Sequence, residues 1–285
     1  MKKILIAFMA MAVVLSGTGC KKKNKVEKLH KTSVVLVNGE EHSYKTGELE
    51  GLINNVPVES LVWKSGSISG MDIAAMQTYC KESLKELDME KINFAKDMGS
   101  YSTDVSYHPI AYVSDAVSIP YAMCYGFKVL ERVVLPKATR SIEDFAFASC
   151  TNLSEVVFGP LESMDSYCFL GAPLTDLTLP EGLKSLKAET FYNCPLERLV
   201  LPSTLCSIFD DTFLYNTSLE SKLKEVIIYA KDPPAVGRST VLNKDGSVFG
   251  YVSSSLKIKV PKGCVAKYNQ APNWRMHDSY IVEMD

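Results

Sequence analysis

One apolar pattern, Leu-x-x-Val-x-Leu, recurs along the second half of the chain and constrains its fold more than any other feature. Copies begin at residues 130, 153, 174, 196 and 223, and a looser copy begins at residue 255. The successive starts are separated by 23, 21, 22, 27 and 32 residues. A unit of this length cannot bury its own apolar face, so the units must stack and share one continuous core.

Each copy predicts a short parallel strand followed by a segment that returns to the start of the next strand. The alternation of the pattern directs its first, fourth and sixth residues into the core. Proline at positions 136, 180 and 202 ends the strand because it lacks a backbone donor. We therefore expect a leucine-rich solenoid, with one buried column of aromatic rings along its return segments. The members of this column are Phe147, Phe169, Phe191 and Phe213.

A weaker echo of the repeat precedes it. Residues 58–63, 70–82 and 84–89 indicate a strand, a helix and a second strand. Asp72 is the candidate cap of the helix, whose buried face would contain Ile73, Met76 and Cys80. The polar, tyrosine-rich residues 90–118 indicate an insertion, and residues 119–130 match the return segment of a unit that lacks a clear strand.

These patterns predict an α/β repeat fold. We expect a right-handed leucine-rich-repeat solenoid with short parallel strands, an N-terminal strand-helix cap and a C-terminal cap. The expected divisions are a signal peptide at 1–19, a lipidated flexible tether at 20–31, an N-terminal cap with an insertion at 32–118, the leucine-rich repeats at 119–254 and the C-terminal cap at 255–285.

The N-terminus has the layout of a secretory signal. Lys2 and Lys3 precede an apolar run at 4–15 that is too short to span a bilayer. Small residues then lead to Cys20, which resembles the processing site of bacterial lipoproteins and implies a lipid on this cysteine. Gly17 stands where such sites usually have an aliphatic residue, so ordinary secretion is the alternative. The lysine-rich residues 21–28 indicate a solvated tether, or else a contact with anionic head groups.

The remaining cysteines indicate packing and not chemistry. Cys150 and Cys194 occupy equivalent positions two units apart, which stacked strands separate by about 10 Å, beyond the reach of a disulfide. We interpret them, together with the inward-facing Cys124 and Cys168, as small apolar core residues. A disulfide elsewhere among the seven cysteines other than Cys20 stays open. The four histidines lie apart from the cysteines, so no metal and no cofactor is predicted.

Three short segments contain residue types that catalyse or bind. The His-Asp-Ser run at 277–279 is interpreted as a polar patch, because a catalytic triad is a spatial arrangement and sequence neighbours point apart. Residues 243–250 contain a turn-forming Asp-Gly but lack the alternating acids of a calcium loop. Tyr268 and Trp274 could contact a sugar, although packing in the cap is the favoured interpretation.

The whole unit, as in residues 130–150, combines the strand pattern with a later isoleucine and an Ala-Phe-x-x-Cys ending. It resembles the BspA-type leucine-rich repeats of bacterial surface proteins. Residues 59–89 and 260–274 are similar to the flanks of such repeats in lipoproteins of Gram-negative anaerobes. The unit that contains Cys168 departs from the pattern because it has no terminal cysteine, and the last two units are lengthened. The resemblance implies an anchored, non-catalytic protein, and some relatives are adhesins.

The expected function is binding of another macromolecule. We expect a monomeric outer-membrane lipoprotein, on the cell surface or the periplasmic face, that binds a protein or glycan of a host or neighbouring cell. The net charge of −2 offers no support for a nucleic-acid partner. One alternative is a glycan-binding accessory lipoprotein, whose mark would be exposed aromatics in one plane. A second is a hydrolase with its site in the 90–118 insertion, where Asp104 and His108 are the ionisable candidates, and a third is a purely structural envelope protein.

The candidate binding residues are the third and fifth positions of each strand, which should project from the outer face of the sheet. Stacking brings neighbours in a column to about 4.8 Å, so Arg132 can pair with Glu155, and Asp176 with Arg198. The fifth column is either an apolar binding stripe or a reflection of β-propensity alone. The third column is Arg132, Glu155, Asp176, Arg198 and Glu225, and the fifth is Val134, Val157, Thr178, Val200 and Ile227.

Overall fold

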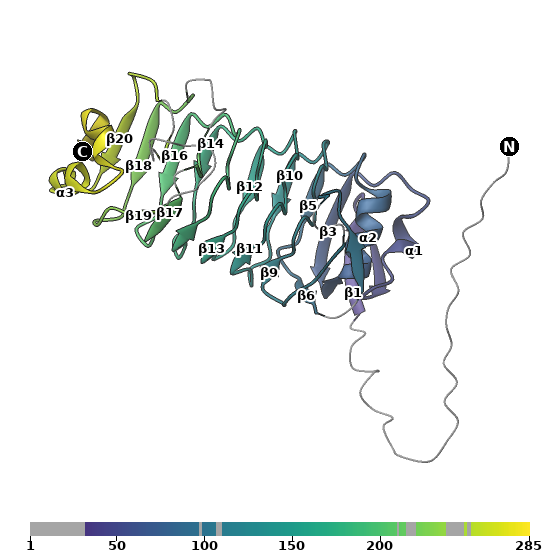
Figure 1. The fold of residues 1–285 in the computed structure, drawn as a ribbon. Coiled ribbons are helices and arrows are strands. Elements are labelled where there is room, and N and C mark those ends of the chain that lie inside the picture. The colour runs from purple at the N-terminus through teal and green to yellow at the C-terminus, as the bar shows by residue number, and fades with distance from the viewer. Residues whose placement is uncertain are drawn as a thin grey trace, which may run out of the picture. The chain divides into compact units, whose positions relative to one another are not determined.

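The protein folds as a stack of parallel turns, seen in a computed structural model that describes residues 32–96, 99–106, 110–209, 211–214, 221–237, 248–249 and 252–285. Residues 31–285 form one compact unit. In Figure 1 the turns follow one another from the purple N-terminal strands to the yellow C-terminal helices, so that neighbours in sequence are neighbours in space. This arrangement confirms the repeat solenoid that the recurring pattern predicts.

The Leu-x-x-Val-x-Leu segments form the front strands of the solenoid. Their parallel pairing is in register, with Arg132 opposite Glu155 and Asp176 opposite Arg198. The front strands are β3 (Ser60–Ser65), β5 (Glu86–Asp88), β10 (Arg132–Val134), β12 (Glu155–Val157), β14 (Asp176–Thr178), β16 (Arg198–Leu201), β18 (Glu225–Ile228) and β20 (Lys257–Val260). They fall into two sheets, because β12 and β14 end their respective sheets and are not paired with each other.

The return segments form a second, continuous parallel sheet. Each strand contributes a serine and an aliphatic residue at the same register along most of the stack, as in the pairing of Ser141–Ile142 with Ser163–Met164. The return strands are β9 (Ser118–Ile119), β11 (Ser141–Ile142), β13 (Ser163–Met164), β15 (Ser185–Leu186), β17 (Ser207–Phe209) and β19 (Ala235–Gly237). The described helices lie outside this repeated region, so its turns are built from strands and loops.

The N-terminal part extends the front sheet. Strands β1 (Thr32–Val37) and β2 (Glu40–Lys45) form an antiparallel hairpin, and β1 pairs antiparallel with β3. Asn38 and Gly39 link the hairpin with φ angles of 50° and 91°, the left-handed conformations that a two-residue type I′ turn requires. Because β5 pairs in parallel with both β3 and β10, the predicted strand at 84–89 is the front strand of the unit whose return segment is 119–130. The prediction that this unit lacks a clear strand is therefore wrong.

The segment 90–118 is partly built into the solenoid. Strand β6 (Asn93–Ala95) pairs in parallel with β4 (Ser67–Ser69), and β9 begins the return sheet. The excursion between them contains an antiparallel hairpin of β7 (Ser100–Ser102) and β8 (Ile110–Tyr112). Tyr101 and Ala111 bury the inner face of this hairpin, whereas Ile110 and Tyr112 are each 65% exposed.

The N-terminal helix is capped by a different residue from the one expected. Helix α2 (Gly70–Tyr79) has Ser69 as its N-cap, and the Ser69 side chain accepts from the Asp72 backbone while Asp72 accepts from the Ser69 backbone. Asp72 is therefore the third helical residue of a capping box. Its buried carboxylate also accepts from the backbone of Gly47 and Leu49, which ties the turn before α1 (Glu50–Ile53) to α2. The buried face of α2 contains Ile73 and Met76, as expected, and Cys80 follows it.

The C-terminal cap closes the core with aromatic residues. It consists of α3 (Val265–Gln270), the 3-10 helix η1 (Arg275–Tyr280) and β21 (Ile281–Glu283), which pairs in parallel with β20. Tyr268 and Trp274 are fully buried and meet edge to face at 5.2 Å. Their polar atoms donate to the carbonyls of Ala230 and Pro234. This burial confirms packing in the cap as their role.

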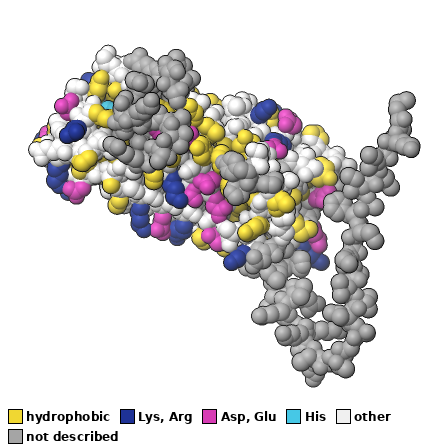
Figure 2. Space-filling view, in the orientation of Figure 1, with side chains coloured by type: hydrophobic (Ala, Val, Ile, Leu, Met, Phe, Trp, Pro, Cys, Tyr) yellow, Lys and Arg dark blue, Asp and Glu magenta, His cyan; other side chains and the backbone are white. Residues whose placement is uncertain are grey.

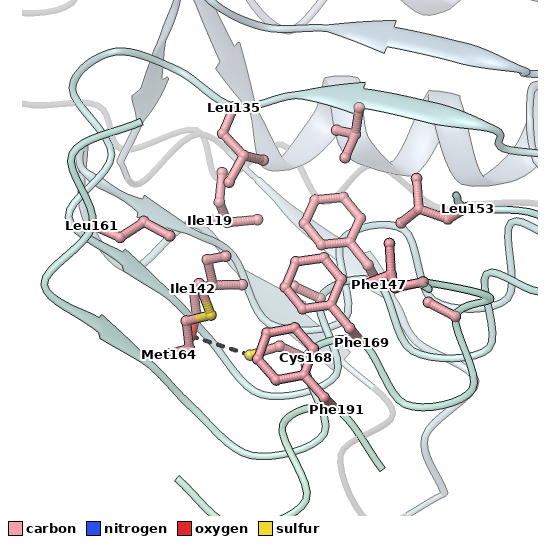
Figure 3. Packing of buried hydrophobic residues seen from close by; sticks show 14 of the residues in the cluster. Ile119, Leu135, Ile142, Phe147, Leu153, Leu161, Met164, Cys168, Phe169 and Phe191 are labelled. Atoms are coloured by element: carbon pink, nitrogen blue, oxygen red, sulfur yellow. Dashed lines mark hydrogen bonds between the residues drawn. The ribbon is translucent and has the colours of Figure 1, made fainter. Parts of the chain in front are cut away.

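The predicted ring column forms the centre of the core. Phe147, Phe169, Phe191 and Phe213 are all buried, and adjacent rings stack at 5.4, 5.4 and 5.6 Å. Figure 3 shows three of these rings lying above one another beside Cys168, whose thiol donates to the Ile142 carbonyl. Each turn therefore contributes one ring to the stack.

The cysteines pack as predicted. Cys80, Cys124, Cys150, Cys168 and Cys194 are buried, and all seven described cysteines are free thiols. Burial raises the pKa of Cys150 to about 12, because the charged thiolate is penalised in an apolar interior. The thiols of Cys150 and Cys194 instead donate to the carbonyls of Cys124 and Phe169 on the preceding turn. Cys206 is the exposed exception among the described thiols.

The predicted signal peptide and tether, Cys20 included, lie outside the described residues, as do His108 and most of 243–250. Within the part of the chain that the structure describes, no helix has the length and apolar character needed to cross a bilayer.

Candidate binding face

The third column of the front strands forms a ladder of ion pairs. Arg132 donates to Glu86 and Glu155, each at 2.9 Å. Arg198 donates to Asp176 and Glu225, each at 3.1 Å. Both predicted pairs, Arg132–Glu155 and Asp176–Arg198, are therefore confirmed as contacts. On the face drawn in Figure 2, basic and acidic side chains also lie next to one another, and apolar side chains fill the surface between these charged groups.

The ladder continues beyond β18. Glu225 also accepts from Lys259 at 2.7 Å, and this hydrogen bond is the main reason that the pKa of Glu225 lies below its usual range. Exposed ion pairs contribute about 0.2–1 kcal/mol each. The ladder therefore orders the surface side chains and adds little to the free energy of folding.

The fifth column is not the uniformly exposed stripe that the alternation predicts. Val157 is 39% exposed and Thr178 is exposed, but only 5% of Val134 and 6% of Val200 are accessible. The register is nevertheless correct, because the fourth and sixth residues of these strands face the core. Ile227 is half-buried.

Neighbouring strands explain the burial of the two valines. Val134 lies between Asp88 and Val157 of the adjacent strands. Val200 lies between Thr178 and Ile227 in the same way. A short branched side chain with a same-face neighbour on each side loses most of its contact with water. The prediction that Val134 and Val200 are exposed binding residues is therefore wrong, because their neighbours on the front face cover both side chains.

Within the fifth column, exposure is highest where the front sheet is interrupted. We define the sheet break as residues 155–158, in and just after β12, together with residues 176–178 in β14. Val156 and Phe158 occupy inward positions of the repeat but are only half-buried, whereas their equivalents Val133 and Leu135 are 0% and 2% exposed. The sheet break therefore brings core-type apolar side chains partly to the surface.

A hollow of about 210 Å³ lies between α2 and the β7–β8 excursion. Asp104 lines it, forms an ion pair with Lys81 and has a 65% exposed side chain. The described lining residues include no histidine, and His108 lies outside the described residues. The lining residues are Ala74, Gln77, Thr78, Lys81, Ser102, Asp104 and Tyr125.

The other sequence candidates do not assemble a reactive site. His277 is 3% exposed, whereas the neighbouring Asp278 and Ser279 are exposed, so the three side chains do not share a site. Burial lowers the pKa of His277 to about 4, which keeps the imidazole neutral at pH 7. The described residues contain no group of three or more His, Cys, Asp or Glu side chains arranged to hold a metal.

Stacked parallel turns and a continuous ring column define a leucine-rich-repeat solenoid, a class that is typically non-catalytic. The model of the BspA type leucine rich repeat region matches residues 117–222 in six copies. The chain is thus a leucine-rich-repeat protein whose repeats at 117–222 belong to the BspA type.

A solved structure offers a further comparison. The chain is similar to a leucine-rich repeat protein from Bacteroides ovatus, known from its crystal structure, with 18% identity and a TM-score of 0.37. The match covers 71% of this chain and 57% of that protein, so the chain spans little more than half of the length of its structural relative. No curated protein matches the chain.

Proposed function

We propose that this protein is a lipid-anchored component of the cell envelope whose solenoid binds another macromolecule through its front face. The observation that carries the proposal is the front face itself, where parallel pairing keeps the side chains of successive strands in register and Arg132 and Arg198 each link the acids of two neighbouring strands. Repeated turns that align side chains in this way form extended surfaces suited to a macromolecular ligand.

The anchor is supported by the N-terminal sequence. Lys2 and Lys3, the apolar run at 4–15 and the small residues before Cys20 have the order of a lipoprotein signal. A lipid on Cys20 would hold the solenoid at the outer membrane through the lysine-rich tether. The ligand would then be a protein or glycan of a host or of a neighbouring cell, and adhesion would be the outcome.

Binding of a protein is better supported than binding of a glycan. Trp274 and Tyr268, the two aromatic candidates for a sugar, are fully buried. The described tyrosines that remain more than a third exposed, Tyr79, Tyr112 and Tyr229, come from α2, β8 and the residue after β18. A sugar platform would instead need its rings in one plane.

The proposed function is tested with the purified full-length protein against immobilised extracellular-matrix proteins and, in parallel, immobilised glycans. We expect saturable binding to a protein, reduced at least tenfold by Val157→Lys at an unchanged melting temperature. Lys224→Ala serves as the control, because Lys224 is the second residue of its strand pattern and lies outside the third and fifth columns proposed to bind. Saturable binding that persists in Val157→Lys would move the site away from the front face. Binding to glycans alone would contradict the protein ligand.

A further inference from the structure

Charge along the third column alternates in sign except at one place. Acid and base follow each other from Glu86 through Arg132 to Glu155, and again from Asp176 through Arg198 to Glu225. At the junction of these two series, Glu155 and Asp176 occupy equivalent positions on consecutive front strands. Like charges on adjacent strands destabilise a sheet, so this junction stands apart from the described remainder of the column.

The same junction is the interruption of the front sheet. Strand β12 pairs with β10 on one side and β14 pairs with β16 on one side, but β12 and β14 are not paired with each other. The return strands of these turns remain paired, with Ser163 opposite Ser185. The turns therefore remain stacked, and the loss of strand pairing is confined to the front. The unit that begins at 153 is also the shortest, with 21 residues before the next start.

The surface of the sheet break combines acidic and apolar character. The carboxylate side chains are 57% exposed at Glu155 and 62% exposed at Asp176. Beside them are the 39% exposed Val157 and the half-buried Val156 and Phe158. The position-two residues at the junction are the neutral Ser154 and Thr175, so that column supplies no cation there either.

We propose that the sheet break docks a polypeptide segment of a partner protein, and that an arginine or lysine of this segment lies between Glu155 and Asp176. A guanidinium or ammonium group at this place restores the alternation of charge along the column. The alkyl part of the same side chain, and an apolar neighbour, pack on Val157 and on the accessible parts of Val156 and Phe158. The inference rests on the proposed binding function and specifies the chemistry of its partner.

Charge complementarity and the apolar surroundings favour a peptide side chain over a metal ion. Glu155 and Asp176 each accept a hydrogen bond from an arginine, Arg132 or Arg198, and hard cations need more oxygen ligands than these two carboxylates supply. Arg132 is also shared with Glu86, and Arg198 with Glu225. With the Lys259 partner of Glu225 included, the four acids of this network still outnumber its three bases, which leaves net negative charge. A cation carried on an apolar stem fits both properties of the surface.

The experiment measures fluorescence anisotropy of a short labelled peptide in which one arginine is flanked by valines. A second peptide contains citrulline at the arginine position and so differs in charge while keeping a similar shape. Both are titrated with the detergent-solubilised full-length protein at low and at high salt. We expect the arginine peptide to bind at least tenfold more tightly than the citrulline peptide, and to lose affinity at high salt.

The variants then locate the site. Glu155→Gln combined with Asp176→Asn should weaken the arginine peptide about tenfold, which corresponds to about 1.4 kcal/mol. Glu162→Gln combined with Glu197→Gln removes the same charge from ion pairs elsewhere on the solenoid and should leave binding unchanged. Equal binding of the two peptides, no measurable binding, or equal losses in both double variants would overturn the proposal.

The chain's own basic tether is the competing occupant. Changing Lys21, Lys22 and Lys23 to serine should leave peptide affinity within twofold if the site accepts a partner. A large gain would show that the tether fills the break, and would overturn the partner assignment. If the arginine peptide does not bind while Val157→Lys still abolishes capture of a matrix protein, the cation inference fails and the proposed function stands.

Discussion

Phe169 stacks on Phe191 of the next turn with ring centroids 5.4 Å apart and planes inclined by only 3°. The two rings are fully buried and belong to residues separated by one repeat. The stack continues through Phe213 to Phe249, and Trp274 meets the edge of the column at 6.0 Å. The column thus links the repeats to the C-terminal cap.

Replacing Phe191 with alanine should lower the free energy of unfolding by about 3–5 kcal/mol, because the cavity separates two stacked neighbours. Phe191→Leu retains most of the volume and should cost less than about 2 kcal/mol. Denaturant titration of both variants measures these losses. A cost below about 1 kcal/mol for Phe191→Ala would contradict a shared core.

Acid should weaken the C-terminal cap through His277. Burial lowers its pKa from 6.5 to about 4, so the folded state holds it neutral while the unfolded chain takes up a proton. The contribution is therefore present above pH 6.5 and is lost as the pH falls towards 4. Between pH 7 and pH 5 the loss should be about 2 kcal/mol. His277→Leu should remove this part of the pH dependence, and identical pH profiles for the two proteins would refute it.

Thiol reactivity should follow burial. Iodoacetamide should modify Cys206 in the native protein and leave Cys80, Cys124, Cys150, Cys168 and Cys194 unmodified, because burial raises the pKa of these five thiols. Peptide mass mapping before and after unfolding measures the difference. Rapid native labelling of Cys150 or Cys194 would contradict the packing described for them.

Two lysine substitutions at equivalent positions should differ in their effect on stability. Val157→Lys places the charge at an exposed site and should change the free energy of unfolding by less than about 0.5 kcal/mol. Val200→Lys places it at a covered site and should cost more than about 2 kcal/mol. Denaturation curves of the two variants measure both losses in the free energy of unfolding. Equal losses would contradict the greater exposure of Val157 at the sheet break.

The membrane anchor is tested at Cys20. The wild-type protein should incorporate a labelled fatty acid and enter the detergent phase on phase separation, whereas Cys20→Ala should incorporate none. Equal labelling of the two proteins would refute lipidation at this residue. Unchanged membrane fractionation of Cys20→Ala in detergent-free buffer would equally contradict Cys20 as the anchor.

Much of the fold could be predicted because the same local pattern recurs in many turns, so that the structure inferred for one turn applies to the others. The spacing of Phe147, Phe169 and Phe191 places equivalent side chains above one another, and the charges of Arg132 and Glu155 suit the pairing that follows. The sequence predicts Asp72 as the cap of α2, whereas the structure has Ser69 there. Both residues of a capping box carry oxygen acceptors, and spacing alone does not tell which one precedes the helix.

The sequence by itself determined the stacked turns, the inward residues and the order of charges along the third column, since these depend on periodicity alone. Only the tertiary structure decided that Val134 and Val200 are covered while Val157 is exposed, because exposure depends on whether a strand has neighbours on both sides. It also decided that the front sheet is interrupted between β12 and β14. A parallel sheet forms its hydrogen bonds only where neighbouring strands lie at the right spacing. Pairing in the return sheet sets that spacing at the back of each turn, and it does not set the spacing of the front strands.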